Sequence, residues 1–338
     1  MVPVLDSNKQ PLMPCSEKRA RKMMQKGAAT AYWQKGIFCI KLTKEPSDRK
    51  YQEVVLGVDP GSKREGYTAA TKKSVVLNIT TDTPDWVKRH IETRRTLRRS
   101  RRQRKTPYRP MRNNRSSLRK SDRIPSSTLA RWNAKLRVIK LLQRILPLTC
   151  VNVEDVRART KRGQKKWNSS FSSLEQGKGY FYGQIGQLGL KLIKTQGYQT
   201  HAHRIARRLE KSKRKLDFSW EAHNVDSHVL CELVLGQDIK PFKSIYRLNF
   251  LEFHRRQLHV QNPIRNGIRK PYGTTISLGI PRGSIVKYKG RLVFVGGTAK
   301  GRISVHNINT GKRIALNVYL ENICPLYKSS WRMQLITT

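Results

Sequence analysis

Three acidic side chains lie in short apolar segments that are far apart in the chain. Asp59 ends the run VVLGVD, Glu154 lies in CVNVEDV, and Asp226 lies in WEAHNVDSHVL. A carboxylate in such a segment is costly to bury without a metal or a partner, and phosphodiester cleavage by two metal ions about 4 Å apart needs several carboxylates around one phosphate. We therefore expect Asp59, Glu154 and Asp226 to be catalytic ligands of two Mg²⁺ ions, with Mn²⁺ as a substitute.

A fourth candidate catalytic residue is His223, three positions before Asp226. On one helix, residues at this spacing face the same side, where a histidine could activate the attacking water or steady the phosphate. Three of these four residues also have a simpler interpretation when each is taken alone. Asp59 can cap the turn at Pro60, Glu154 can be a surface charge at a strand end, and His223 can be an ordinary residue near a helix N-terminus. The combination of the segments favours the catalytic interpretation.

Composition indicates a polyanionic partner. The 338 residues include 70 Lys and Arg against 22 Asp and Glu, a formal charge of +48, and such an excess favours salt-dependent binding to RNA or DNA. An apolar content of 37% is enough for one moderate core with one or two small modules. The five cysteines are scattered without a C-x-x-C pair, which fits a reducing compartment. No run of about eighteen apolar residues occurs, so we expect no membrane partner and a cytoplasmic, nucleoid-associated protein.

The element pattern predicts an α/β fold. EVVLGVD, GYTAATK and SVVLNITT have the spacing of an antiparallel meander. Apolar residues at three and four residue spacings predict an amphipathic helix over 127–146, and CVNVEDV is a further strand. We expect a helix followed by a strand over 188–201, one helix over 220–235, and a small β-barrel of short strands after about residue 270.

A strongly basic segment lies between the meander and the amphipathic helix. Residues 94–120 contain thirteen Lys or Arg and no Asp or Glu. Such a run is often only a solvated basic helix, but this many cations repel one another unless a partner neutralises them. The residues that we expect to bind an RNA or an RNA–DNA heteroduplex are Arg94, Arg95, Arg98, Arg99, Arg101, Arg102, Arg104 and Lys105.

The order GVDPGSK, arginine-rich helix, strand glutamate and H-x-x-D resembles the split RuvC nuclease of the transposon-encoded IscB and IsrB proteins, relatives of the ancestors of type II CRISPR effectors. QPLMPCSEKRARKMMQKGAA, residues 10–29, resembles their PLMP module, and RRTLRRSRRQRK resembles their bridge helix. Glu221 and Ser227 depart from the Lys and Ala that the family often carries around the third motif. Residues 155–222 contain no histidine other than His201 and His203, so an HNH nuclease is not expected, which favours IsrB.

The resemblance implies an RNase H-like (RuvC) mixed sheet that is split by the bridge helix, with a small N-terminal PLMP module and a C-terminal domain resembling a small β-barrel. It also implies an RNA-guided endonuclease that nicks the non-target strand of double-stranded DNA, as a monomeric protein in a ribonucleoprotein with a structured guide (omega) RNA. A short DNA motif beside the target would be contacted by Arg265, Arg269, Lys270, Lys287 and Arg291. The alternatives are a guide-free RuvC-like resolvase and a catalytically inactive RNA-binding protein.

Boundaries follow from the motifs and the changes in composition. The expected domains are the PLMP module at 1–52, the first RuvC segment at 53–92, the bridge helix with its basic tail at 93–123, the second RuvC segment with connecting helices at 124–222, the third RuvC segment at 223–240, and the C-terminal domain that reads the flanking motif at 241–338.

Overall fold

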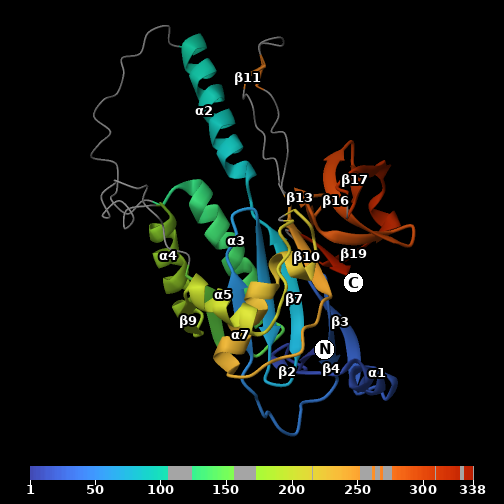
Figure 1. The fold of residues 1–338 in the computed structure, drawn as a ribbon. Coiled ribbons are helices and arrows are strands. Elements are labelled where there is room, and N and C mark those ends of the chain that lie inside the picture. The colour runs from blue at the N-terminus through green and yellow to red at the C-terminus, as the bar shows by residue number, and fades with distance from the viewer. Residues whose placement is uncertain are drawn as a thin grey trace, which may run out of the picture. The chain divides into compact units, whose positions relative to one another are not determined.

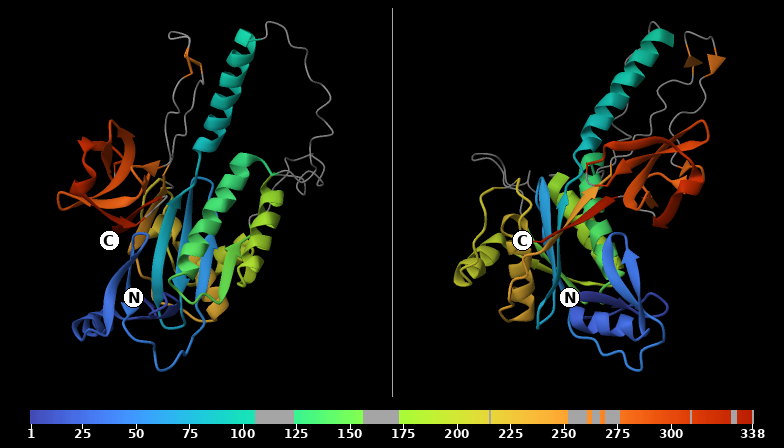
Figure 2. Two further views of the ribbon diagram at one scale, coloured as in Figure 1. Left: turned by 180° about the vertical axis from the view of Figure 1, so that it is seen from behind. Right: turned by 90° about the vertical axis from the view of Figure 1, so that its right-hand side faces the viewer.

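The structure is a computed structural model. It describes residues 1–105, 124–155, 173–214, 216–251, 261–262, 267–268, 276–308, 310–327 and 331–337 (Figures 1 and 2). The chain divides into two compact units, Met1–Arg247 with Leu335–Thr338, and Leu248–Gln334. Among the described residues, no helix is long and apolar enough to cross a membrane.

An N-terminal module of four strands and one helix opens the first unit. The strands are β1 (Val2–Leu5), β2 (Pro11–Cys15), β3 (Ala29–Gln34) and β4 (Ile37–Leu42), in the order β2-β1-β4-β3. Helix α1 (Glu17–Gln25) begins after Ser16, whose hydroxyl accepts a hydrogen bond from the backbone N–H of Arg19 at 3.3 Å. The segment PLMPC forms β2, which is an edge strand of this sheet.

The main sheet has seven strands in the order β20-β10-β7-β6-β5-β8-β9. Their bounds are β5 (Val55–Asp59), β6 (Arg64–Ala70), β7 (Val75–Asp82), β8 (Cys150–Glu154), β9 (Lys191–Thr195), β10 (Ile245–Phe250) and β20 (Trp331–Ile336). Strands β5, β6 and β7 pair antiparallel in sequence, which confirms the predicted meander. Strand β8 runs parallel to β5, and β9 runs parallel to β8.

Helices cover both faces of this sheet (Figure 2). On one face, Lys135 of α3 (Ser126–Gln143) pairs with Glu65 of β6, and α4 (Ser173–Gln187) packs beside α3. On the other face, α7 (Val225–Leu235) lies on β5 and β6, with α5 (Gly197–Ala206) against it. Because side chains alternate along a strand, neighbouring residues of β6 contact the two different helical layers. The predicted amphipathic helix over 127–146 is confirmed as α3.

Two predicted elements are wrong. Over 188–201 the strand β9 comes first and α5 follows, and the change occurs at Gln196, which forms a reciprocal capping box with Gln199. The single helix expected over 220–235 is divided into α6 (Trp220–His223) and α7. The break lies at Asn224, whose side-chain amide donates to the carbonyl oxygens of Tyr67 and Ile79 at 3.0 and 3.2 Å. These bonds attach Asn224 to the sheet.

Helix α2 (Trp86–Lys105) leaves the end of β7 and projects beyond the sheet (Figure 1). The arginine-rich run RRTLRRSRRQRK is helical, and the helix begins eight residues before Arg94. Side chains are described as far as Ser100 and at Gln103. Arg101, Arg102, Arg104 and Lys105 have side chains outside the described part, and the basic tail at 106–123 lies outside it altogether.

The second unit contains an antiparallel sheet in the order β18-β17-β16-β15-β19. Its strands are β15 (Ile285–Tyr288), β16 (Arg291–Ala299), β17 (Arg302–Asn307), β18 (Arg313–Val318) and β19 (Ile323–Tyr327), with a short helix η3 (Leu320–Asn322) before β19; the two-residue strands are β11 (Gln261–Asn262), β12 (Gly267–Ile268), β13 (Ile276–Ser277) and β14 (Ile280–Pro281). The division between the two units follows Arg247, and β10 lies in the main sheet.

Candidate active site

Asp59 and Glu154 lie next to each other because of the register of two parallel strands. Val58 pairs with Val153, so the following residues, Asp59 and Glu154, end adjacent strands at the same edge of the sheet, about 5 Å apart in backbone spacing. Both carboxylates also lie on the α7 face. Gly57, two residues before Asp59, contacts α7, and residues two apart on a strand share a face.

Asp226 reaches this edge from α7, which approaches the sheet closely. A Cβ built on Gly66 of β6 would lie 1.7 Å from the carbonyl oxygen of His223, so only glycine allows the chain to pass there. The hydroxyl groups of Thr68 and Ser227 share a hydrogen bond of 2.8 Å. Asp226 lies three residues after His223, in the first turn of α7, and is buried.

The three carboxylates are electrostatically coupled. Burial raises the pKa of Asp59 well above its usual range, and the neighbouring charges of Glu154 and Asp226 raise it further. Burial also raises the pKa of Glu154, again with a contribution from Asp226, and a hydrogen bond joins the carboxyl groups of Asp59 and Glu154. Converging carboxylates that resist ionisation together are a suitable ligand set for a hard divalent cation, which prefers oxygen. The residues at this edge therefore fit Mg²⁺.

Two cations at the same place were not among the predicted site residues. Arg204 of α5 donates from Nη1 to Oδ1 of Asp226 at 2.6 Å, and Nζ of Lys211 pairs with Oδ2 of the same residue. Lys211 also lowers the pKa values of Asp59 and Glu154. It belongs to the basic run RRLEKSKRK. Nothing in that run distinguishes Lys211 from its neighbours, because its partner becomes apparent only when the chain is folded.

His223 ends α6 and Asp226 lies on the next helix, so the two residues do not lie on one helix as expected. The catalytic role of His223 stays a prediction. The expected RNA-binding residues Arg94, Arg95, Arg98 and Arg99 are all exposed on α2.

The residues expected to read a flanking DNA motif are described only in part. Lys287 and Arg291 are exposed on the hairpin of β15 and β16. The turn of this hairpin, at Lys289 and Gly290, has positive φ at both positions, as in a type I′ turn. Arg265, Arg269 and Lys270 lie outside the described residues.

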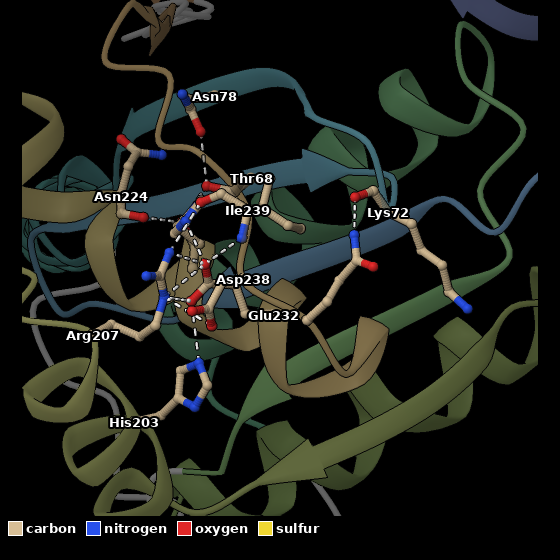
Figure 3. A network of polar contacts seen from close by, with 12 residues as sticks. Thr68, Lys72, Asn78, His203, Arg207, Asn224, Glu232, Asp238 and Ile239 are labelled. Atoms are coloured by element: carbon tan, nitrogen blue, oxygen red, sulfur yellow. Dashed lines mark hydrogen bonds and ion pairs between the residues drawn. The ribbon is translucent and has the colours of Figure 1, made fainter.

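A second grouping of possible ligands, His203, Glu232 and Asp238, surrounds a guanidinium (Figure 3). Arg207 donates to Glu232 at 3.0 Å and lies 3.1 Å from Asp238. Although burial works in the opposite direction, the adjacent His228, whose Nε2 lies 3.2 Å from Oε1 of Glu232, and the hydrogen bonds from Arg207 and the backbone of Ile239 lower the pKa of Glu232 to about 2. Arg207 pairs with both carboxylates, so we assign this grouping as an ion network that joins α5 to α7.

The fold and the site define a mixed α/β protein with three carboxylates gathered at one edge of its main sheet, beneath a helix. The chain belongs to the RRXRR protein family, whose model matches residues 2–178. The matched region includes the run RRSRR at Arg98–Arg102. No curated protein matches this chain.

Two solved structures of RuvC from Thermus thermophilus are similar to part of the chain. The one in complex with a Holliday junction substrate has 14% sequence identity and a TM-score of 0.27, covering 56% of this chain and 83% of that chain. The other has 14% identity and a TM-score of 0.25, covering 56% of this chain and 84% of that chain.

Proposed function

We propose that this chain is an RNA-guided DNA endonuclease of the IsrB type, which uses a RuvC-like site to nick the non-target strand of double-stranded DNA. The observation that carries the proposal is the adjacency of Asp59 and Glu154 beneath the helix that bears Asp226. A phosphodiester nuclease with two metal ions requires carboxylates from separate segments at one place. Further support comes from the strand order β7-β6-β5-β8-β9 with antiparallel β6, the order expected of an RNase H-like sheet.

Asp59, Glu154 and Asp226 are the residues that would hold the Mg²⁺ ions. Bound there, Mg²⁺ would offset the charge of the scissile phosphate and lower the pKa of the attacking water. The chain itself orients these ligands. The strand register aligns Asp59 with Glu154, Arg204 holds Asp226 from the side of α5, and His223 is the proposed residue that assists proton transfer.

The basic helix supports a nucleic-acid partner. Along α2 the arginines at 94, 95, 98 and 99 are exposed, and Glu92 is the acidic residue within the helix. A helix with cations on several faces can bind phosphates of a guide on one side and of a target on the other. We propose that α2 binds the guide RNA and its heteroduplex, and that the hairpin bearing Lys287 and Arg291 contacts the duplex beside the target.

The proposal is tested by expressing the chain with its native flanking DNA, sequencing the RNA that copurifies, and assaying that ribonucleoprotein on supercoiled plasmid with Mg²⁺. We expect one abundant structured RNA and a nicked product that disappears with EDTA or in Asp59→Asn. Asp155→Asn is the matched control, because Asp155 follows Glu154 but pairs with Lys178 and Tyr182 at 2.8 and 2.9 Å.

Other outcomes identify the alternatives. Cleavage without a defined RNA indicates a guide-free resolvase. RNA binding that is equal in wild type and Asp59→Asn, with no cleavage in either, indicates an inactive RNA-binding protein. Cleavage that survives Asp59→Asn contradicts the assignment of the site.

A further inference from the structure

Both carboxylate oxygens of Asp226 are engaged by side-chain cations. Arg204 holds Oδ1 and Lys211 holds Oδ2, while the Asp226 side chain is only 5% exposed. A divalent cation that binds either oxygen meets a positive side chain already paired with it, and the repulsion between the two positive charges opposes metal binding. Lys211 also interacts electrostatically with all three carboxylates, Asp59, Glu154 and Asp226.

The two cations differ in how they are held. Arg204 projects from the last turn of α5, where it also contacts Nδ1 of His201 at 2.9 Å, and its side chain is 17% exposed. Lys211 lies in the segment between α5 and α6, outside any helix or strand, and its side chain is 35% exposed. The side chain of Lys211 can therefore reach solvent by rotating away from Asp226. Arg204 is less exposed and is carried by a helix, so it is held more firmly beside Asp226.

The segment that carries Lys211 is anchored at its far end. The ring of Phe218 has the guanidinium of Arg64 at 3.5 Å and that of Arg247 at 3.4 Å from its centroid. Arg64 also donates to the carbonyl oxygen of Asp217 at 3.1 Å. Nearer to Lys211, the backbone N–H of Ser212 donates to the carbonyl oxygen of Glu221 at 2.9 Å. These contacts keep Lys211 beside the carboxylates, so its effective concentration there is high.

We propose that Lys211 is a tethered counterion that competes with divalent metal for the Asp59, Glu154 and Asp226 site, so that Lys211 sets how readily the site binds its metal. This inference rests on the proposed metal site. In the metal-free protein, Lys211 balances part of the charge of the three carboxylates. When a divalent cation binds, Lys211 leaves Asp226 and turns to solvent, beside the exposed Lys213 and Arg214.

The test is a calorimetric titration of the purified full chain with Mn²⁺ alone, which does not depend on cleavage. Lys211→Met keeps the length of the side chain and removes its charge, and we expect it to bind Mn²⁺ about tenfold more tightly than wild type, as loss of a nearby like charge requires. Lys213→Met, which removes the same charge two residues away, is the matched control and should bind like wild type. Asp226→Asn in the Lys211→Met background should abolish the tight binding.

A second measurement uses the wild-type chain, in case Lys211→Met does not fold. Lysine acetylation followed by mass spectrometry should modify Lys211 slowly without metal and at least a few-fold faster with saturating Mn²⁺, while Lys213 does not change. Two outcomes would overturn the inference and leave the metal site intact. One is an equal Mn²⁺ affinity in wild type and Lys211→Met, and the other is an acetylation rate of Lys211 that does not change with Mn²⁺. Absence of Mn²⁺ binding in every variant would overturn the inference and the proposed metal site together.

Discussion

A Cβ built on Gly57 would lie 1.9 Å from the carbonyl oxygen of Ser227. Helix α7 therefore packs directly on the backbone of β5. On β5 the contact is at Gly57, two residues before Asp59, and on α7 it is at Ser227, one residue after Asp226. The distance between β5 and α7 is set by this contact. The same contact consequently determines how far Asp226 lies from the two carboxylates at the strand ends.

Gly57→Ala should destabilise the fold, because the methyl group meets a backbone atom that cannot rotate away. Overpacking of this kind costs about 1–3 kcal/mol or more, which urea unfolding would measure. The matched control is Gly183→Ala in the interior of α4, where a Cβ meets nothing within 4 Å. That variant should gain about 0.5–1 kcal/mol from helix propensity. Equal effects of the two substitutions would contradict the close packing of α7 on β5.

Lys135→Met should destabilise the protein strongly, because it leaves Glu65 buried without its cation. The two side chains are 4% and 2% exposed, and Glu65 also accepts a hydrogen bond of 2.5 Å from the hydroxyl of Tyr67. Removing one member of a buried pair costs about 3–5 kcal/mol. The double variant Lys135→Met with Glu65→Gln should recover much of that loss in urea unfolding, since no buried charge remains.

A substitution on the same helix provides the control for the buried pair. Lys140 is exposed near the end of α3, and Lys140→Met should change the free energy of unfolding by no more than about 0.5 kcal/mol. A double variant as unstable as Lys135→Met alone would show that the pair contributes through packing and not through charge.

Glu232→Gln should remove a pH-dependent part of the stability. The pKa of Glu232 is lowered from 4.5 to about 2 in the folded protein, so its contribution is fully present above pH 4.5 and is lost as the pH falls toward 2. The variant should be less stable than wild type by roughly 3 kcal/mol at pH 7, and the gap should narrow below pH 4.5. Urea unfolding at a series of pH values measures the gap. The control is Glu210→Gln, at an exposed position before α6, which should show no pH-dependent difference in stability from wild type. If the stability difference for Glu232→Gln were constant with pH, it would contradict the ion network around Arg207.

Much of the site could be predicted from local pattern. Short apolar runs predict β5 and β8, and a carboxylate at the end of each is visible in the sequence. The spacing of the meander and of α3 follows from alternation and from the three and four residue repeat, which depend only on near neighbours in the chain. The charge of +48 likewise indicates a polyanionic partner without reference to the fold.

Other features were decided by contacts between distant residues. The break between α6 and α7 depends on the bonds from Asn224 to Tyr67, 157 positions away, and no local signal at Asn224 predicts them. The sequence of Lys211 and its basic neighbours is equally uninformative about which of them pairs with Asp226. Local periodicity indicates many of the helices and strands, but the break at Asn224 and the partner of a buried charge are selected by tertiary packing, which excludes water from these groups.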